Sequence, residues 1–304
     1  MSGDPPAMYL EAFGLKKQPF SLSADPSMLY FTDFHQEALA AVSYGLLEKK
    51  GLMLLLGHAG TGKTTVVARA MLRLPASRVQ FVSIVNPTMD AKAFLESVLL
   101  GFGILKVPAS KAQRLARLEE HLMRTQTEGK IAVLIVDEAH KLSPKALEEL
   151  RLLGNLERDS EKLLQILLVG QNEIRAVLNR GDCVQLKQRV ALRVSLRALT
   201  PAEVGQYIAC RWARAGGKQL APFSPQAVDL IARVSEGVPR LINVICDNAL
   251  MSAFGDHAST VQAGHVSQSC LELDLMDAPL ESLPDLEVPA RSIPGESRRS
   301  TWAV

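Results

Sequence analysis

The chain has 304 residues, 47% of them hydrophobic and 22% charged, and a formal net charge of +2. These values are ordinary for a soluble globular protein with one large or two small domains, and the charge by itself indicates neither nucleic acid nor a membrane as a partner. No apolar run approaches the ~20 residues of a membrane helix, and the N-terminus lacks the pattern of a secretory signal. We therefore expect a soluble, cytoplasmic protein without direct membrane insertion.

The charge is unevenly distributed along the chain. Residues 272–304 hold seven acidic and three basic residues, a net charge of −4, which leaves +6 on the remainder. A mildly basic body leaves DNA open as a partner. The cysteines show no metal-binding spacing, so free thiols are expected. They are Cys183, Cys210, Cys246 and Cys270.

The N-terminal part predicts an extension followed by a helix. Residues 1–7 are expected to be disordered, whereas residues 9–30 are too apolar for a free tail. We expect residues 1–35 to pack on the core, either as simple packing or at the border of a bound adenine. Residues 35–48 show apolar residues at helical spacing. The apolar residues of the extension are Phe13, Phe20, Leu29 and Tyr30.

A phosphate-binding loop follows the first predicted strand. Five apolar residues at 52–56 run into G-H-A-G-T-G-K-T, which matches G-x-x-x-x-G-K-[ST]. Backbone N–H groups of such a loop and the N-terminus of the next helix bind phosphate oxygens. Lys63 is expected to reach the β- and γ-phosphates, and the Thr64 hydroxyl to bind Mg²⁺. The residues expected to bind the nucleotide are Gly57, His58, Ala59, Gly60, Thr61, Gly62, Lys63, Thr64 and Thr65.

Strand and helix patterns alternate after the loop, which predicts a doubly wound, mainly parallel α/β sheet. Ligands of such sheets lie beyond the carboxyl ends of the strands, and Gly57, Asp137 and Gln171 all fall at such ends. Asp90 and Ser143 are predicted N-caps. The predicted strands are 79–85, 131–136, 163–169 and a short 194–196, and the predicted helices are 63–74, 90–100, 110–128, one from Ser143, and short ones to about Val190.

Two acidic residues follow the strand at 131–136. Asp137 is expected to hold Mg²⁺ through water beside Thr64. Glu138 is the candidate to orient and deprotonate an attacking water, and a pair of solvated acids is the alternative. Residues 137–140 also spell the helicase box D-E-A-H, but the chain is too short for two motor domains and no G-R-x-G-R motif follows.

Polar residues near the end of the α/β region are further candidates. Gln171 or Asn172 is expected to hydrogen-bond the γ-phosphate or the water, with a turn amide as the alternative. Arg189 and Arg193 lie four residues apart in a predicted helix, which puts them on one face. One of them is a candidate to stabilise transition-state charge in a neighbouring subunit's site, and a solvated helix face is the alternative.

From residue 200 onward the pattern is helical. Thr200 and Glu203 predict a capping box, with Pro201 at the first helical position. Arg240, in a turn at 237–240, opens a helix and would reach the phosphates if this domain is a lid. Residues 272–304, with a proline every five residues from Pro279, predict a disordered acidic tail. The predicted helices of this small domain are 200–215, 224–235, 241–254 and 260–271.

These motifs together resemble AAA+ P-loop ATPases. The joint pattern is the phosphate-binding loop, the D-E box, the polar strand end, the Q-R helix and the G-x-P-R turn. FGLKKQPFSLSADPSMLYF, H-Q-E-A-L from His35, Gly45, LLVGQNEI and EGVPRLINVICDNAL look closely like the ExeA-type ATPases of general secretion. Pilus-biogenesis ATPases and TniB/TnsC-type transposition ATPases are related to these. The resemblance covers roughly residues 8–271.

The resemblance implies a P-loop NTPase three-layer sandwich at 36–199 with a small all-α lid domain at 200–271. It also implies Mg-dependent ATP hydrolysis and a homo-oligomer that assembles through its ATP sites and drives or switches a secretion or pilus assembly. Arg189 would be the trans-acting arginine, with Arg193 still open, and Arg240 the lid sensor. A DNA-associated transposition regulator and a nucleotide-gated binding module remain alternatives. Asn172 stands where many relatives have proline, and the membrane helix and peptidoglycan-binding region of longer ExeA-type proteins are not found.

Overall fold

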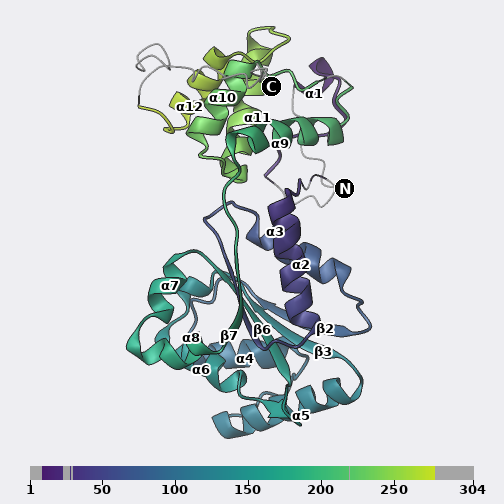
Figure 1. Ribbon diagram of the computed structural model, residues 1–304, viewed down its shortest axis with the longest axis vertical. Helices are drawn as coiled ribbons and strands as arrows, with labels where there is room; N and C mark the ends of the chain where they lie inside the picture. The colour runs from purple at the N-terminus through teal and green to yellow at the C-terminus, as the bar shows by residue number, and fades with distance from the viewer. Residues whose placement is uncertain (1–8, 23–27, 29, 219, 278–304) are drawn as a thin grey trace, which may run out of the picture.

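The chain forms two lobes joined by a narrow neck (Figure 1). The structure is a computed structural model that describes residues 9–22, 28, 30–218 and 220–277. The lower lobe is a sheet covered by helices, and the upper lobe is helical. The disorder predicted for residues 1–7 lies outside the described residues, as does the part of the predicted disordered tail, 272–304, that follows residue 277. For residues 272–277 the predicted disorder is wrong, because Leu275 and Met276 pack against the upper lobe. Within the described residues, no helix has both the length and the apolarity that crossing a membrane requires.

Five parallel strands form the sheet of the lower lobe, in the order β2-β3-β6-β1-β7. The central strands β1, β3 and β6 are continuous apolar runs, buried over their whole length because helices cover both faces. The edge strands β2 and β7 carry exposed residues. The predicted parallel α/β sheet is therefore confirmed. The strands are β1 Leu52–Leu56, β2 Val79–Ile84, β3 Ile131–Val136, β6 Leu164–Gly170 and β7 Val190–Ser195.

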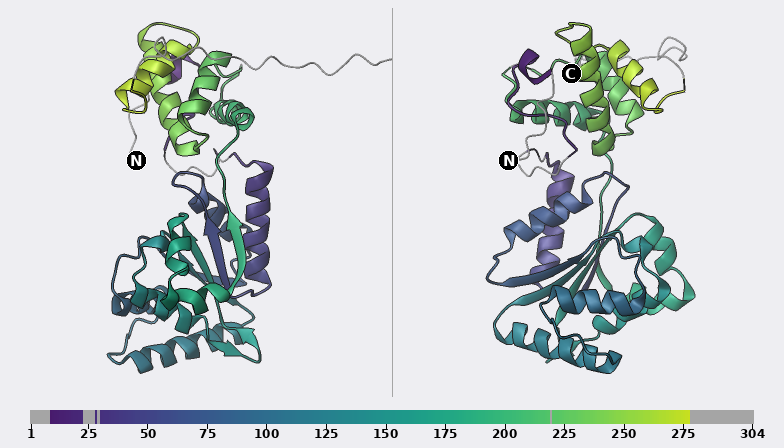
Figure 2. Two further views of the ribbon diagram at one scale, coloured as in Figure 1. Left: turned by 60° about the vertical axis from the view of Figure 1, so that its left-hand side comes forward. Right: turned by 180° about the vertical axis from the view of Figure 1, so that it is seen from behind.

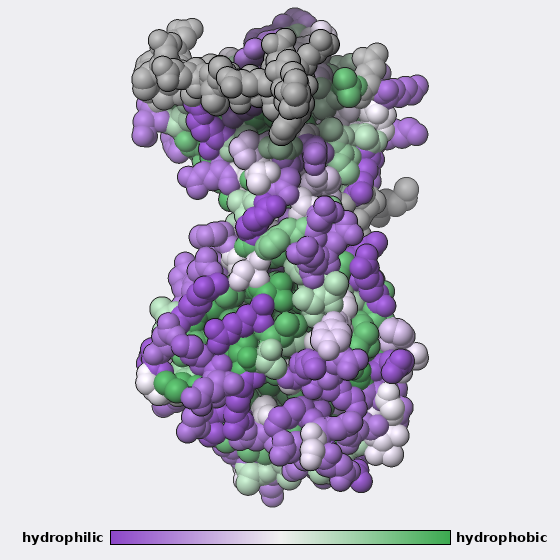
Figure 3. Space-filling model, in the orientation of Figure 1, coloured by the Kyte–Doolittle hydropathy of each residue, from purple (hydrophilic) through white to green (hydrophobic). Residues whose placement is uncertain are grey.

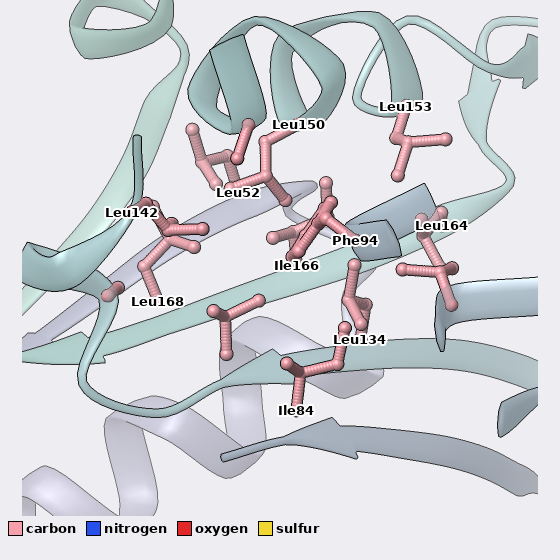
Figure 4. Close-up of a cluster of buried hydrophobic side chains, with 14 of the residues drawn as sticks. Leu52, Ile84, Phe94, Leu134, Leu142, Leu150, Leu153, Leu164, Ile166 and Leu168 are labelled. Carbon is pink, nitrogen blue, oxygen red and sulfur yellow. The ribbon is translucent and has the colours of Figure 1, made fainter. Parts of the chain in front are cut away.

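Alternate residues of each strand face opposite layers of helices, which makes the lobe a three-layer sandwich. Met53 and Leu55 pack with α2 (Asp33–Leu47) and α3 (Lys63–Arg73). Leu52, Leu54 and Leu56 pack on the opposite face. Figure 4 shows this second cluster, where strand residues such as Leu134 and Ile166 meet Phe94 and Leu150. The helices on this face are α4 Ala91–Gly101, α5 Lys111–Thr127, α6 Pro144–Leu153, α7 Glu173–Leu178 and α8 Val184–Gln188.

Local sequence signals define several helix starts. The side chains of Asp90, Ser143 and Thr200 each accept a hydrogen bond from a backbone N–H three residues later, so the three predicted N-caps are confirmed. Gly45 lets α2 approach the sheet closely, because a Cβ there would lie 2.5 Å from the Met53 sulfur. This contact explains a glycine inside a helix, where it otherwise costs stability.

Two features of the lower lobe were not predicted correctly. The last strand begins at Val190 rather than at residue 194. Its first residues were not predicted because half-buried and exposed positions alternate and form no long apolar run. A small antiparallel hairpin, β4 (Glu157–Arg158) with β5 (Glu161–Lys162), has no hydrophobic alternation to reveal it. Short 3₁₀ turns at Ala139–Lys141 and Gly181–Cys183 complete the lobe.

Four helices form the core of the upper lobe, as predicted. Their buried residues make one apolar cluster that contains Val204, Ile231, Ile245 and Val266. The cluster continues past the predicted end at residue 271, because Leu275 and Met276 pack against it. The helices are α9 Pro201–Arg214, α10 Pro225–Val234, α11 Pro239–Gly255 and α12 Ala263–Glu272.

The described part of the N-terminal extension up to Tyr30 packs on the upper lobe, so the predicted packing of the extension on the α/β core is wrong for this part. Tyr9, Phe20 and Met28 are buried in the same cluster as the lid helices. Helix α1 (Tyr9–Ala12) lies beside the helices of the upper lobe in all three views (Figure 2). Phe31 and Phe34, which follow, pack against the apolar cluster of the α/β core. Apolar composition predicts that a segment is packed, but it does not select between two hydrophobic surfaces.

The connection between the lobes is held against the lid by a backbone contact. Leu199 N–H donates to Gly237 O at 2.9 Å. Gly237 has a φ of +70°, and a Cβ at this position would lie 1.9 Å from Leu199 O. Glycine is required here both by the left-handed backbone and by this close approach.

We predict that Gly237→Ala destabilises the lid. The left-handed backbone alone costs about 1–2 kcal/mol for a residue with a Cβ, and the overlap with Leu199 adds to it. Gly255→Ala is the matched control, because a Cβ there meets nothing within 4 Å and the position is helical. The control should gain about 0.5–1 kcal/mol. Denaturant unfolding measures both, and equal stability of the two variants would contradict the prediction.

Candidate functional site

The phosphate-binding loop connects the end of β1 to the start of α3 by a left-handed turn. Gly60 and Gly62 have φ of +77° and +92°, conformations that glycine adopts without strain. A Cβ on Gly57 would lie 2.6 Å from the Thr61 hydroxyl oxygen. Helix α3 begins at Lys63, directly after this turn. The backbone N–H groups of its first turn have no partner within the helix and are directed into the loop.

Lys63 lies buried in this loop, with 6% of its surface exposed. Its Nζ donates to Gly57 O and His58 O, both at 2.9 Å. Burial lowers the pKa of Lys63, and the carboxylates of Glu138 and Asp137 oppose that shift. The ammonium group is therefore held at the centre of the loop, where a phosphate chain would meet it.

His35 supports the loop from the start of α2. Its Nε2 lies 3.2 Å from Thr61 O, and its Nδ1 lies 2.8 Å from the Thr32 hydroxyl oxygen. A carbonyl only accepts, so Nε2 carries the proton and Nδ1 accepts from Thr32. In a trans peptide the C=O and the following N–H point in opposite directions. The bond to Thr61 O therefore turns the Gly62 N–H away from His35 and toward the loop centre.

The two predicted acids lie at the end of β3 beside the loop. Thr64 Oγ1 donates to Asp137 Oδ2 at 3.1 Å, so the expected metal-binding pair is in contact. Glu138 adopts a left-handed backbone, φ +52°, which is uncommon for a residue with a side chain. Its Oε2 lies 3.4 Å from His140 Nε2 and 3.3 Å from Lys141 Nζ.

His140 connects the acid to the end of β6. Gln171 N–H donates to His140 Nδ1 at 3.4 Å, so the ring proton is on Nε2, which faces Glu138. Asn172 Nδ2 lies 3.4 Å from His58 Nε2. The residues that follow β1, β3 and β6 thus lie together, as their common edge predicts.

A pocket of about 620 Å³ lies between the loop and the lid. Glu138, Gln171 and Arg240 all line it. The lid touches the loop directly, because a Cβ on Gly60 would lie 2.8 Å from Arg240 Cβ. Asp137 accepts a hydrogen bond from Thr64, which lines the pocket. The predicted loop residues that line the pocket are Ala59, Gly60, Thr61, Gly62, Lys63, Thr64 and Thr65.

The two arginines expected on one helix face are not arranged in that way. Arg189 caps the C-terminus of α8, and Arg193 lies on the edge strand β7. Neither lines the pocket of its own chain. Arg189 Nη1 lies 3.5 Å from Arg151 O, Arg193 Nη2 lies 3.4 Å from Lys187 O, and both side chains are exposed. The prediction of a shared helix face is wrong because the helix ends before Val190.

Several residues of this pocket are not indicated by the sequence. His140 stands inside the D-E-A-H run, and His35 follows the cap residue Thr32 by three positions, but neither spacing indicates a contact with the loop. Tyr207 and Arg211 of α9 also line the pocket. They had no signal in the sequence, because their position depends on how the lid packs.

The residues present fit a nucleotide with a divalent cation. A cradle of glycines, a buried ammonium group and a hydroxyl–carboxylate pair are the parts that bind a triphosphate and Mg²⁺. These features define a P-loop site. Residues 47–178 match the model of the family described as AAA domain. The fold and the site are therefore those of an AAA-type P-loop protein.

Particular relatives narrow this class. The chain is 39% identical over 270 residues, or 88% of its length, to general secretion pathway protein A of Aeromonas hydrophila. It spans about half of that relative, 48% of its length. The ATP-dependent target DNA activator B of Escherichia phage Mu is 26% identical over 74% of this chain and 67% of its own. The resemblance to AAA+ ATPases of the ExeA type and to transposition ATPases is confirmed.

Solved structures agree on the fold. Cdc6p from Pyrobaculum aerophilum has a TM-score of 0.66 at 21% identity, with coverage of 84% of this chain and 70% of that one. The ORC2 protein of Aeropyrum pernix, in ADPNP and ADP complexes, has a TM-score of 0.62 at 18% identity, with coverage of 84% and 72%. Identities this low support the P-loop NTPase fold alone.

We predict that His35→Phe destabilises the protein. The apolar ring leaves Thr61 O without its partner beneath the loop, and an unsatisfied buried acceptor costs about 1–3 kcal/mol. His121→Phe is the control, because His121 is half-buried and bonds a side chain, Gln80, at 3.2 Å. Thermal unfolding of both variants measures the difference. A His35 variant as stable as the control would remove His35 from this role.

Proposed function

We propose that the chain is a Mg-dependent ATPase that assembles through its ATP sites. The observation that carries the proposal is the 3.1 Å hydrogen bond from Thr64 to Asp137, with Glu138 beside it and Lys63 in the loop. A phosphate loop alone supports binding. An acid next to the metal-binding pair also supports hydrolysis.

The phosphates would be bound by the loop. Backbone N–H groups of residues 60–64 and the start of α3 supply hydrogen-bond donors, and Lys63 supplies a charge at the β- and γ-phosphates. Thr64 and Asp137 would hold Mg²⁺, which when bound neutralises charge on the phosphate oxygens. Their contact keeps both oxygen ligands together.

Glu138 would take the proton of the attacking water. His140 and Lys141 both lie within 3.4 Å of its Oε2, so they fix the carboxylate beside the pocket. Gln171 lines the same pocket and would orient the water or the γ-phosphate through its amide. Arg240 would contact the phosphates from the lid, so that the position of the lid would depend on whether phosphates are bound.

A neighbouring subunit would supply a further positive charge to the site. Arg189, or alternatively Arg193, is proposed to stabilise the transition state in a neighbouring subunit, because both are exposed and absent from their own pocket. Figure 3 shows hydrophobic residues over the front of the lower lobe, where Figure 1 draws the β7 edge. An edge strand with apolar neighbours is suited to contact another chain.

The partner proposed for the assembly is a secretion or pilus apparatus, since the relative at 39% identity is a general secretion pathway protein. A DNA-associated regulator is the second candidate. It is supported by the similarity to a target DNA activator and by the +6 charge of residues 1–271. ATPase activity with and without DNA over a salt series separates the two.

We predict that Glu138→Gln binds ATP but hydrolyses it at least a hundredfold more slowly, the scale of a lost general base. Lys63→Ala should lose binding as well, because the loop loses its charge. Nucleotide binding by calorimetry and phosphate release measure the two steps. Lys130→Ala, far from the pocket, is the control. Undiminished hydrolysis by either site variant would contradict the proposed function.

We predict that Arg189→Ala subunits mixed with Lys63→Ala subunits regain activity if the arginine acts across an interface. Each mixed contact can pair an intact loop with an intact arginine, although each parent protein is inactive. Phosphate release is measured over a series of mixing ratios, and the Arg193→Ala mixture is run in parallel. Recovery with Arg193 alone assigns the role to that residue. No recovery at any ratio argues against action in trans.

A further inference from the structure

A buried arginine of the lid fastens the N-terminal extension to it. Arg211 lies on α9 with 6% of its surface exposed. Its Nε donates to Pro19 O at 2.6 Å and its Nη2 to Ser21 O at 3.1 Å. Its Nη1 donates to Tyr207 Oη at 3.2 Å. One side chain thus binds two carbonyls of a segment about 190 residues away in the sequence.

This arrangement makes the extension and the lid depend on each other. Over the residues that the structure describes, Arg211 has no carboxylate partner, and a buried cation is costly unless its donors are paired. The extension supplies two of its three acceptors. If the extension left, the guanidinium would keep only Tyr207, so the bound arrangement is strongly favoured.

Further contacts join the same two parts. Tyr30 Oη donates to Gln206 Oε1 at 2.9 Å, and its ring packs edge-on against Tyr207, with ring centres 5.8 Å apart. Tyr207 Oη donates to Asn243 Oδ1 at 2.8 Å on α11. Lys16 N–H donates to Ala215 O at 2.8 Å. The extension, α9 and α11 therefore form one wall.

This wall borders the nucleotide pocket. Ser21, Met28 and Tyr30 line the pocket from the extension, and they share it with the phosphate-binding loop. Tyr207, Arg211 and Asn243 line it from the lid. A nucleotide is elongated. If the loop binds its phosphates, its ribose and base would lie against this wall.

We propose that Arg211 is a positioning residue for the nucleoside part of ATP, because it holds the backbone of Pro19 and Ser21 in the wall that receives the base. The inference rests on the ATP binding proposed above. It requires that the free energy of binding from the nucleoside depends on Arg211, whereas the free energy from the triphosphate does not, since the loop is held by Lys63 and His35.

The test compares two ligands on the wild type and on three variants. In Arg211→Met, the dissociation constant for Mg·ATP should rise at least tenfold, while that for magnesium tripolyphosphate should change less than twofold. Arg211→Lys keeps the charge but has no planar fork for three acceptors, so it should resemble Arg211→Met. Arg233→Met on α10, an exposed arginine of the lid, is the control and should match the wild type. Isothermal calorimetry measures all four proteins.

A second variant keeps the test decisive if Arg211→Met does not fold. Tyr207→Phe removes only the hydroxyl that accepts from Arg211 and donates to Asn243. It should weaken Mg·ATP binding two- to fivefold and leave tripolyphosphate binding unchanged. Equal loss for both ligands in the folded variants, or wild-type affinity for ATP, overturns the inference. Rescue by Arg211→Lys also overturns it, because charge would then suffice.

The proposed function fails in a different way. If the wild type binds neither Mg·ATP nor tripolyphosphate, or if Lys63→Ala binds both normally, the site is not a nucleotide site. If the wild type binds ATP through Lys63 and the Arg211 variants bind it equally well, the nucleotide site stands and only the role of Arg211 is lost.

Discussion

The hydrogen bond from Thr64 to Asp137 joins residues that are 73 positions apart, and the rest of the site depends on it. It is formed because β6 lies between β1 and β3, with Leu56 opposite Gly170 and Val136 opposite Leu168. Three carboxyl ends therefore stop at nearly the same level, and the side chains that follow them meet. A strand order with β1 and β3 far apart in the sheet would separate the loop from the acids.

The second wall of the pocket is built differently. It contains no part of the sheet and depends on buried polar contacts, above all the three hydrogen bonds of Arg211. Such contacts are specific because a buried guanidinium tolerates few arrangements. The lid also reaches the loop through Arg240 beside Gly60, and helix α2 reaches it through His35. The loop is thus contacted from the core, the lid and the start of α2.

Much of the core and the loop could be predicted from short patterns. G-x-x-x-x-G-K-T after an apolar strand, the caps at Asp90 and Ser143, and the capping box at Thr200 are all local, because the interacting groups lie within a few residues. The extension could not be assigned to the lid, since its apolar residues would be buried equally by either lobe. Arg189 and Arg193 were assigned to one helix because β7 is a short edge strand with alternating exposure. It has no continuous apolar run that would distinguish it from the preceding helix.

By itself, the sequence determined the parallel α/β core, the helical lid and which polar residues follow the strand ends, because each depends on periodicity or on neighbours along the chain. Only the tertiary structure decided that His35 holds the loop, that His140 bridges Glu138 and Gln171, and that Arg211 fastens the extension to the lid. The contacts of His35 with Thr61, His140 with Gln171 and Arg211 with Pro19 join residues between 26 and 192 positions apart. No local pattern specifies them, since they follow from how two lobes and one extension pack.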